Sequence, residues 1–198
     1  RAEAIATAMT TRFPSEVHGY FRLGWVYMEA QRYADAIAPY EIALAMKPSD
    51  LSTYYNLCLC LARTDAPEKL AARAKTAIPI CEKRVTLFPE DVMMTLCLAD
   101  LNHWAGQDEA AVAMLSTLEV ATDGWTLYNA ANLAGSVHQP ERGLRLFKRA
   151  LEAGYRTLSL IRTFLDDDDF ASLRGTPEWL EAKAMVDNIL AESASKSD

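Results

Sequence analysis

The sequence contains no apolar run that approaches the roughly 18 to 20 residues needed to cross a bilayer. Its first residues also lack the charged-then-apolar pattern of a secretory signal. Basic residues are in deficit, since 20 Lys and Arg face 27 Asp and Glu and give a formal net charge of −7. We therefore expect neither a membrane nor a nucleic acid as the partner, because nucleic-acid binders normally carry the opposite sign of charge.

Cysteine is scarce, and its spacing excludes the common metal sites. The four residues, Cys58, Cys60, Cys81 and Cys97, form no pair of CxxC units of the kind that binds zinc. Cys58 and Cys60 are two positions apart, so on a helix they point about 200° away from each other. The sequence predicts buried, free thiols in a reducing compartment and, with the missing signal, a cytoplasmic location.

Motifs that carry catalysis or hold a cofactor are missing as well. His18, His103 and His138 are scattered and form no HxxxH or HExxH pair, and no GxSxG, GxxxxGK(S/T) or GxGxxG segment occurs. The acidic run from Asp166 to Asp169 lacks the glycine and the distant glutamate of a calcium-binding loop, and helix capping explains it better. The sequence thus predicts no enzyme, no catalytic residues, no cofactor and no metal.

What the sequence does contain is a repeated pattern of apolar and small residues. Within 34 residues the pattern has three parts. The first is an apolar helical face with Tyr20, Leu23, Gly24 and Tyr27. The second is a face with Ala36, Tyr40 and Ala43, and the third is the terminal Pro48. This order of residue types resembles the tetratricopeptide repeat (TPR). The small residues let two antiparallel helices approach closely, and the proline ends the second helix.

The same register continues along the chain, with a lengthened second helix in the second unit. The resemblance implies an all-α, right-handed superhelical solenoid of about four full repeats, an N-terminal half-repeat and a C-terminal capping helix. We assign residues 1–16 to the second helix of a partial repeat or to an N-terminal cap. The four repeats and the closing segment with its capping helix and disordered tail are then 17–50, 51–91, 92–123, 124–157 and 158–198.

The first residues match the second half of a repeat. Counted back from Val17, Pro14 takes the terminal-proline position, while Ala2, Ala6 and Met9 take positions of the second helix. Two interpretations stay open. The chain is a piece of a longer protein that supplies the first half of this repeat, or the segment is a natural N-terminal cap of the stack.

The C-terminal end departs from the repeat. An acidic stretch followed by Phe-x-x-Leu-Arg-x-x-Pro-x-aromatic, from Asp166 to Trp179, resembles a segment that closes bacterial TPR arrays. Thr176 can cap the last helix and Pro177 suits its first position. One apolar face of this helix would cover the open end of the stack, and it comprises Trp179, Ala182, Met185, Val186, Ile189 and Leu190. From Glu192 onward we expect a polar, frayed tail.

The resemblance also implies where a partner binds, because the first helix of each TPR lines the concave side. Positions on those helices that do not pack internally should be polar if only solvent covers them. Here they carry many large apolar and aromatic side chains, the types enriched at interfaces. We therefore expect the partner-binding residues to be Phe21, Trp25, Met28, Tyr55, Leu59, Asp100, His103, Trp125, Tyr128 and Asn132. The alternative is that the groove is filled from within, which would bury Phe21 and Trp25 as ordinary core.

One known TPR mechanism does not fit the sequence. Some TPR domains hold the C-terminal carboxylate of heat-shock chaperones with a clamp of Lys, Asn and Arg side chains. Asn56 matches its clamp position, but the other positions hold Phe21, Trp25, Met93 and Leu96. Without cations at those positions, no charge-assisted hydrogen bond to a carboxylate forms there.

The sequence thus predicts a protein–protein interaction scaffold that binds a peptide or partner segment in an apolar, aromatic groove. From its closing segment, we expect it to be a regulatory module of a larger bacterial protein, by analogy of fold. Two alternatives stay open: a self-association module that forms a homodimer, and a non-catalytic part of a multidomain signalling enzyme.

Overall fold

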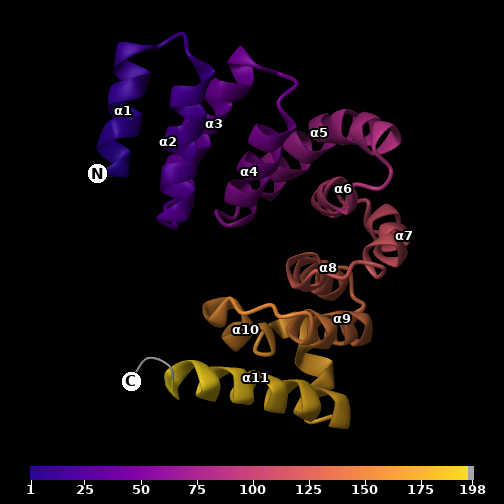
Figure 1. Ribbon diagram of the computed structural model, residues 1–198. Helices are drawn as coiled ribbons and strands as arrows, with labels where there is room; N and C mark the ends of the chain where they lie inside the picture. Colours follow the sequence, from indigo (N-terminus) through magenta and orange to yellow (C-terminus); the bar gives the residue numbers. More distant parts are fainter. Residues whose placement is uncertain (196–198) are drawn as a thin grey trace. The chain divides into compact units, whose positions relative to one another are not determined.

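The computed structural model describes residues 1–195, and their regular structure is entirely helical (Figure 1). Over this range twelve helices follow one another, eleven α-helices and one 3₁₀ helix, η1. None of these helices is long and apolar enough to cross a bilayer. Their bounds are α1 Ala2–Arg12, α2 Val17–Glu29, α3 Tyr33–Met46, α4 Leu51–Ala62, α5 Pro67–Leu87, α6 Val92–Trp104, α7 Asp108–Leu118, α8 Gly124–Ser136, α9 Pro140–Glu152, α10 Leu158–Phe164, η1 Asp168–Leu173 and α11 Pro177–Ser195.

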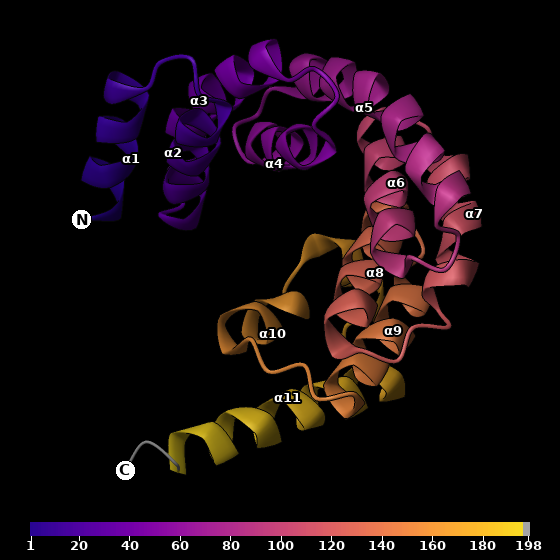
Figure 2. The ribbon, with the colours of Figure 1, turned by 45° about the horizontal axis from the view of Figure 1, so that its top comes forward.

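The chain divides into two compact units. Unit 1 comprises Arg1–Phe88 and Leu101–Gln107, so it holds α1 to α5 and the end of α6. Unit 2 comprises Pro89–Asp100 and the residues from Asp108 onward, with the start of α6 and the helices α7 to α11. Within unit 1, consecutive helices from α1 to α5 pack against each other in antiparallel fashion, and in unit 2 α8 packs on α9 in the same way (Figure 2).

The two helices of a pair are joined by the same tight turn. Gln31, Asp65, Gly106 and His138 occupy this turn with left-handed backbone angles, φ being 58°, 50°, 78° and 59°. Three of the turns share a 2.8–2.9 Å hydrogen bond from the next N–H to a carbonyl five residues back: Arg32 to Tyr27, Gln107 to Asn102, and Gln139 to Ala134. This hydrogen bond is typical of helices that end at a left-handed residue. The turns lie 34, 41 and 32 residues apart, as do the first residues of α2, α4, α6 and α8.

Gly24 sets how closely α2 and α3 approach each other. A Cβ at this position would lie 2.9 Å from three ring atoms of Tyr40, which is itself fully buried. Ala36 and Ala43, the small residues of the pattern on α3, are also fully buried. The small residues of the sequence pattern therefore lie where the helices pack, because larger side chains would force the helices apart.

The second pair of helices is longer than the first, because α5 has 21 residues and α3 has 14. α5 begins at Pro67, a position where the missing N–H of proline has no intrahelical partner to lose. On α5, Arg73 makes a bidentate ion pair with Glu41 of α3. This pair links helices that are not consecutive in the chain.

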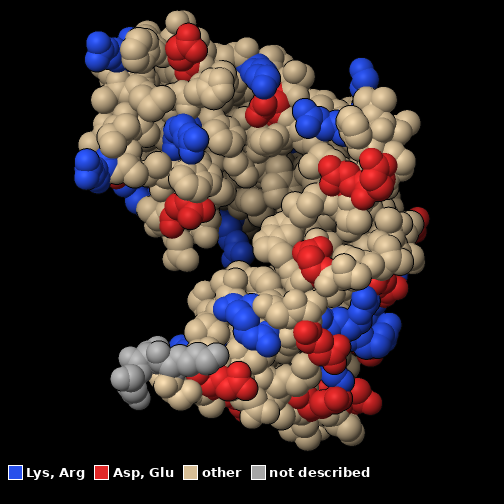
Figure 3. Space-filling model, viewed as in Figure 1, with Lys and Arg blue, Asp and Glu red and all other residues tan. Residues whose placement is uncertain are grey.

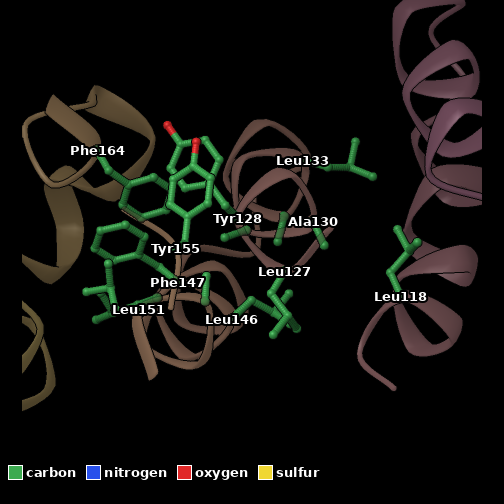
Figure 4. Packing of buried hydrophobic residues seen from close by; sticks show 14 of the residues in the cluster. Leu118, Leu127, Tyr128, Ala130, Leu133, Leu146, Phe147, Leu151, Tyr155 and Phe164 are labelled. Carbon is green, nitrogen blue, oxygen red and sulfur yellow. The ribbon is translucent and has the colours of Figure 1, made fainter. Parts of the chain in front are cut away.

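The core of unit 2 is rich in aromatic rings. Phe147 of α9 stacks on Phe164 of α10 with ring centroids 3.9 Å apart, and Tyr128 of α8 stacks on Tyr155 at 4.3 Å (Figure 4). Phe170 of η1 continues this cluster, 4.5 Å from Phe164. The closing segment of the chain is thus part of the core and covers α8 and α9.

The last helix begins at a side-chain cap. The Thr176 hydroxyl accepts a hydrogen bond from the Trp179 N–H at 3.3 Å, as the sequence predicts. In the acidic run, the Asp167 carboxylate accepts a hydrogen bond from the Asp169 N–H at 3.0 Å and caps η1. The predicted apolar face of α11 packs on the core of unit 2, with Ala182, Val186 and Ile189 buried there.

The frayed tail predicted from Glu192 is wrong for part of its length. α11 continues to Ser195, and residues 196–198 lie outside the described residues. Within this extension the Ser193 hydroxyl donates to the Ile189 carbonyl at 2.8 Å, and the Ser195 hydroxyl donates to the Glu192 carbonyl at 2.9 Å. Ala191 and Ala194 have high helix propensity, which favours the same extension.

Candidate functional site

The residues expected to bind a partner lie on the first helices of the pairs, distributed over both units. In unit 1 they are Phe21, Trp25 and Met28 on α2, Tyr55 and Leu59 on α4, and His103 on α6. In unit 2 they are Asp100 on α6 and Trp125, Tyr128 and Asn132 on α8.

On α2, three of the expected residues share one side of the helix. Phe21, Trp25 and Met28 are four and three residues apart, which is about one helical turn each time. Other sides of α2 pack internally, because Gly19 lies against α1 and Gly24 against α3. The large side chains are therefore left on the side that the neighbouring helices do not cover.

On α4, Tyr55 and Leu59 share a side in the same way, and α4 contacts α2. We call Phe21, Trp25, Met28, Tyr55 and Leu59 the aromatic face of unit 1. Trp25 is 40% exposed, and the other four side chains are half-buried. In Figure 3 basic and acidic side chains interrupt the uncharged surface over α2. The alternative of a groove filled from within does not hold for Trp25, which reaches solvent in unit 1.

Two ring contacts hold the aromatic face in place. Phe21 meets Tyr40 of α3 edge-on, with ring centroids 5.8 Å apart. Tyr55 packs against Trp104 of α6 at 5.4 Å, with the ring planes tilted by 43°. Trp104 is half-buried and belongs to unit 1, so it extends the aromatic face. Rings fixed in this way offer contact area at low entropic cost.

A cleft of about 200 Å³ opens beside Phe21, between the start of α2 and the start of α4. Its lining combines apolar and polar groups: Val17, His18, Phe21, Lys47, Asp50, Ser52 and Thr53. Burial raises the pKa of the Asp50 carboxyl, whereas hydrogen bonds from Lys47 and Thr53 lower it by more. The pKa of Asp50 therefore lies below its ordinary value. Asp50 therefore stays ionised and is already paired with Lys47 at 2.8 Å.

A cation lies beside the most exposed ring of the aromatic face. The guanidinium of Arg22, one turn before Trp25, is 5.9 Å from the centroid of the Trp25 ring. This distance is at the limit of a cation–π contact. The expected site does not include Arg22, because apolar and aromatic positions mainly define it. The spacing of three residues between Arg22 and Trp25 would have indicated that the two side chains lie close together on the helix.

In unit 2, the expectation that Tyr128 is exposed is wrong. Tyr128 is only 7% exposed, because Tyr155 stacks on it and Phe164 of α10 packs beside it at 5.7 Å (Figure 4). The outward side of α8 is thus partly covered by the closing segment of the chain. Trp125, one turn earlier on α8, is 45% exposed.

The polar residues of the expected site are already engaged. The Asn132 side chain donates a hydrogen bond to the Tyr128 carbonyl at 3.0 Å. Asp100 and His103 are half-buried and have interaction partners of their own. Asp100, His103 and Asn132 lie on the helices where the sequence pattern places them, but each side chain already interacts with other residues of the chain.

The described residues hold no group of three or more His, Cys, Asp or Glu that could bind a metal ion. The four cysteines are buried, and none of them forms a disulfide within the described residues. Burial raises the pKa of the Cys58 thiol to about 12 and that of the Cys60 thiol to about 11. Both groups are therefore protonated at neutral pH.

No protein-family model matches this sequence, and a comparison with curated proteins gives no match. Solved structures do resemble the chain. TTC0263, a thermophilic TPR protein of Thermus thermophilus, has a TM-score of 0.59 and 15% identity, over 83% of this chain and 87% of that one. YrrB, also a TPR protein, has a TM-score of 0.50 and 15% identity, over 96% and 97% of the two chains. A chain of the APC/C hetero-tetramer Cut9–Hcn1 has a TM-score of 0.62 and 14% identity, over 96% of this chain and 35% of that one.

Proposed function

We propose that this chain, which has the tetratricopeptide-repeat fold, works as a scaffold that holds a peptide or partner segment against the aromatic face of unit 1. The fold is generally a scaffold for protein–protein interaction. The proposal assigns the chain a binding role rather than a catalytic one. As a regulatory module it would serve a larger bacterial protein, and this part of the proposal rests on the closing segment alone.

The observation that carries the proposal is the exposure of Trp25 among other large apolar side chains. A single exposed apolar side chain is ordinary, but contiguous exposed apolar surface marks interaction sites. Trp and Tyr dominate the binding energy of many interfaces because they bury much area while losing few rotatable bonds. Phe21, Met28, Tyr55 and Leu59 supply such area around Trp25.

Two of the similar structures support a binding role. YrrB is described as a TPR protein with an unusual peptide-binding site, and Cut9 is part of a hetero-tetramer with Hcn1. Both statements concern those proteins. At 14–15% identity they support the class of function for this chain and leave its partner open.

The proposal is tested by selecting binders from a random peptide library displayed on phage. The selected pool is then offered to Trp25→Ala/Tyr55→Ala and to the matched control Ile42→Ala/Met46→Ala, both shown to be folded by circular dichroism. Ile42 and Met46 are exposed apolar residues on α3, at 43% and 38%. We expect at least a tenfold loss of binding with the first variant and no loss with the second.

Two results would contradict the proposal. Equal retention of the pool by both variants would place the binding site elsewhere on the chain. If the library yields no binder and light scattering shows a dimer that Trp25→Ala/Tyr55→Ala disrupts, self-association is the function instead.

A further inference from the structure

The outermost helix of unit 1 has one bare apolar side. In the described residues α1 has extensive contacts with α2 only, whereas α3 packs against both α2 and α4 (Figure 1 and Figure 2). Three apolar residues of α1 and the residue that caps its end are three or four positions apart, so they follow one side of the helix. We call them the α1 stripe: Ala2, Ile5, Met9 and Phe13. Ile5 is 56% exposed and Phe13 is 51% exposed.

The corresponding positions of other second helices are buried. One repeat later, the positions of Ala2, Ile5 and Met9 hold three buried residues of α3: Ala36, Pro39 and Ala43. On α9 the corresponding residues are buried as well: Gly143, Leu146 and Ala150. A Cβ at Gly143 would lie 2.9 Å from the carbonyl oxygen of Ala131 on α8, so this side of α9 faces the first helix of its pair. The side that is bare on α1 is thus the side that a first helix covers elsewhere in the fold.

Polar contacts hold α1 on unit 1 and leave the stripe uncovered. Arg32, in the turn after α2, donates hydrogen bonds to both carboxylate oxygens of Glu3 at 3.1 and 3.0 Å. The Tyr20 hydroxyl of α2 donates to the Pro14 carbonyl at 3.3 Å, directly after the stripe. A helix that binds the stripe therefore meets a preformed surface, which lowers the entropic cost of binding.

The side chains of the stripe determine what can pack on it. Ile5 and Met9 stand where α3 has Pro39 and Ala43, so the stripe supplies large side chains itself. Where α2 packs on α3, the large ring of Tyr40 lies against Gly24, and a Cβ at Gly24 would come within 2.9 Å of that ring. A large side chain on one helix thus requires a small one on the other. A helix that packs closely on the stripe needs glycine or alanine opposite Ile5 and Met9.

A second copy of α1 does not meet this requirement. In a two-fold antiparallel pair of α1 helices, Ile5 of one copy would face Met9 of the other, large against large. Arg1 and Arg12 are eleven residues apart, which is about three turns, so they lie on the same side of α1. The pair would bring Arg12 of each copy beside Arg1 of the other, and like charges disfavour such a contact. A helix of different sequence fits the stripe better.

We infer that the α1 stripe is a docking surface for one amphipathic α-helix of a partner protein, which packs on α1 as α2 packs on α3 and turns glycine or alanine toward Ile5 and Met9. An apolar helix side laid against an apolar surface is a common mode of recognition between proteins. The open apolar end of a stack of repeats also favours a cover of this kind. The stripe and the aromatic face share no residue, so this inference does not rest on the proposed function.

The first test selects binders from a phage library of helical peptides on the whole chain with Trp25→Ala/Tyr55→Ala, which weakens the aromatic face. We expect the selected helices to carry glycine or alanine three or four positions apart on their apolar side. Ile5→Asp/Met9→Asp should weaken binding of a selected peptide at least tenfold, measured by fluorescence anisotropy. The matched control Ala4→Asp/Ala8→Asp adds two carboxylates with the same spacing at exposed positions outside the stripe. It should leave the affinity within twofold.

A second measurement uses a helix of known sequence as the probe. A copy of residues 17–34, which comprise α2 and its turn, is joined in front of Arg1 of the whole chain, so that it precedes α1 with the spacing that α2 has to α3. Joining gives the probe a high effective concentration at the stripe. We expect the backbone amides of α1 to exchange with deuterium at least tenfold more slowly than in the chain without the probe. Ile5→Asp/Met9→Asp should abolish this protection, and Ala4→Asp/Ala8→Asp should keep it.

Three results would overturn the inference. The first is a library that yields no helix whose binding depends on Ile5 and Met9. The second is unchanged exchange of α1 beside the joined probe, or protection that persists in Ile5→Asp/Met9→Asp. The third is a dimer of the unmodified chain, seen by light scattering, that Ile5→Asp/Met9→Asp dissociates, because a second copy would then be the occupant. None of these results bears on the proposed function, which depends on Trp25 and Tyr55.

Discussion

Gln31 shows how a single residue stores strain in the turn that joins α2 to α3. Its φ of 58° places a side chain with a Cβ in the left-handed region, which is unfavourable by about 1–2 kcal/mol. Glycine removes this strain but gains freedom in the unfolded chain. We expect Gln31→Gly to raise the free energy of unfolding by about 0.5 kcal/mol, measured by urea denaturation.

The matched control for this change is the preceding residue. Ala30 has an ordinary φ of −81°, so Ala30→Gly removes no strain and should lower the free energy of unfolding. Equal destabilisation by both substitutions would contradict the role given to the left-handed turn.

The buried thiols lead to a second prediction at the scale of single residues. With pKa values of about 12 and 11, Cys58 and Cys60 are less than about 0.1% ionised at pH 8. An aromatic disulfide reagent should therefore modify them only when the chain unfolds. In urea, Cys58→Ser/Cys60→Ser should react with two fewer equivalents of reagent than the native chain does. In buffer the two proteins should react equally. If the native chain reacts rapidly in buffer with two equivalents more than the variant, these thiols are accessible in the folded state and the prediction is wrong.

At the scale of elements, α9 holds the connection between α7 and α8. The Arg142 Nε donates to the Glu119 carboxylate at 2.7 Å, and Arg149 donates to the backbone carbonyls of Glu119 and Ala121 at 2.7 and 3.1 Å. The hydrogen bond from Arg142, with the nearby arginines, lowers the pKa of the Glu119 carboxyl. The connection is thus fixed by two side chains from one face of the next helix.

This ion pair predicts a pH-dependent contribution to stability. Because the folded pKa of Glu119 lies below the unfolded value of about 4.3, the ionised group stabilises the fold above that value. The contribution disappears as the pH falls through the lower, folded pKa. Glu119→Gln should therefore lower the free energy of unfolding at pH 7, and the difference from the native chain should shrink between pH 5 and pH 3. Urea denaturation at several pH values measures it.

Glu152→Gln is the control for this series, since Glu152 is exposed on α9 and makes no ion pair within residues 1–195. It should leave stability nearly unchanged at each pH. If the difference in free energy of unfolding between the native chain and Glu119→Gln stays constant from pH 7 to pH 3, the role of the ionised carboxylate is contradicted.

The elements themselves could be predicted from the sequence because their signals are local. Pro67 marks the start of α5, Thr176 caps α11, and small residues such as Gly24 mark close helix contacts. The exposure of Tyr128 could not be predicted, because it depends on Tyr155 and on α10, which pack on α8 from later in the chain. Helical periodicity indicates which side of a helix does not pack against the other helix of its pair. It does not indicate whether a later segment of the chain covers that side.

At the scale of the whole molecule, burial is distributed unevenly, and this predicts uneven stability. α1 buries one residue, Ala6, whereas α8 buries nine of its thirteen. Helices with few buried contacts open locally at low free energy. We expect backbone amides of α1 to exchange with deuterium fastest among the helices of ten or more residues, and those of α8 and α9 slowest. Slower exchange in α1 than in α8 would contradict this order.

The repeat register could be recognised in the sequence because each repeat packs in the same way and therefore has the same spacing of apolar and small residues. The division of charge between the units could not be read from the total composition, since it depends on where the chain divides. Unit 1 has eleven Lys and Arg against nine Asp and Glu, a net charge of +2, and unit 2 has nine against eighteen, a net charge of −9. The partner-binding role of the aromatic face of unit 1 is the central claim.

The most direct test of that claim is a hydrogen-exchange footprint of a peptide selected from the library, bound to the whole chain. Our account predicts slower exchange in α2 and α4 on binding, because the peptide covers Trp25 and Tyr55, and no change in α3, α5 or α9. Protection confined to α3, α5 or unit 2 would show that the aromatic face of unit 1 is not the binding site.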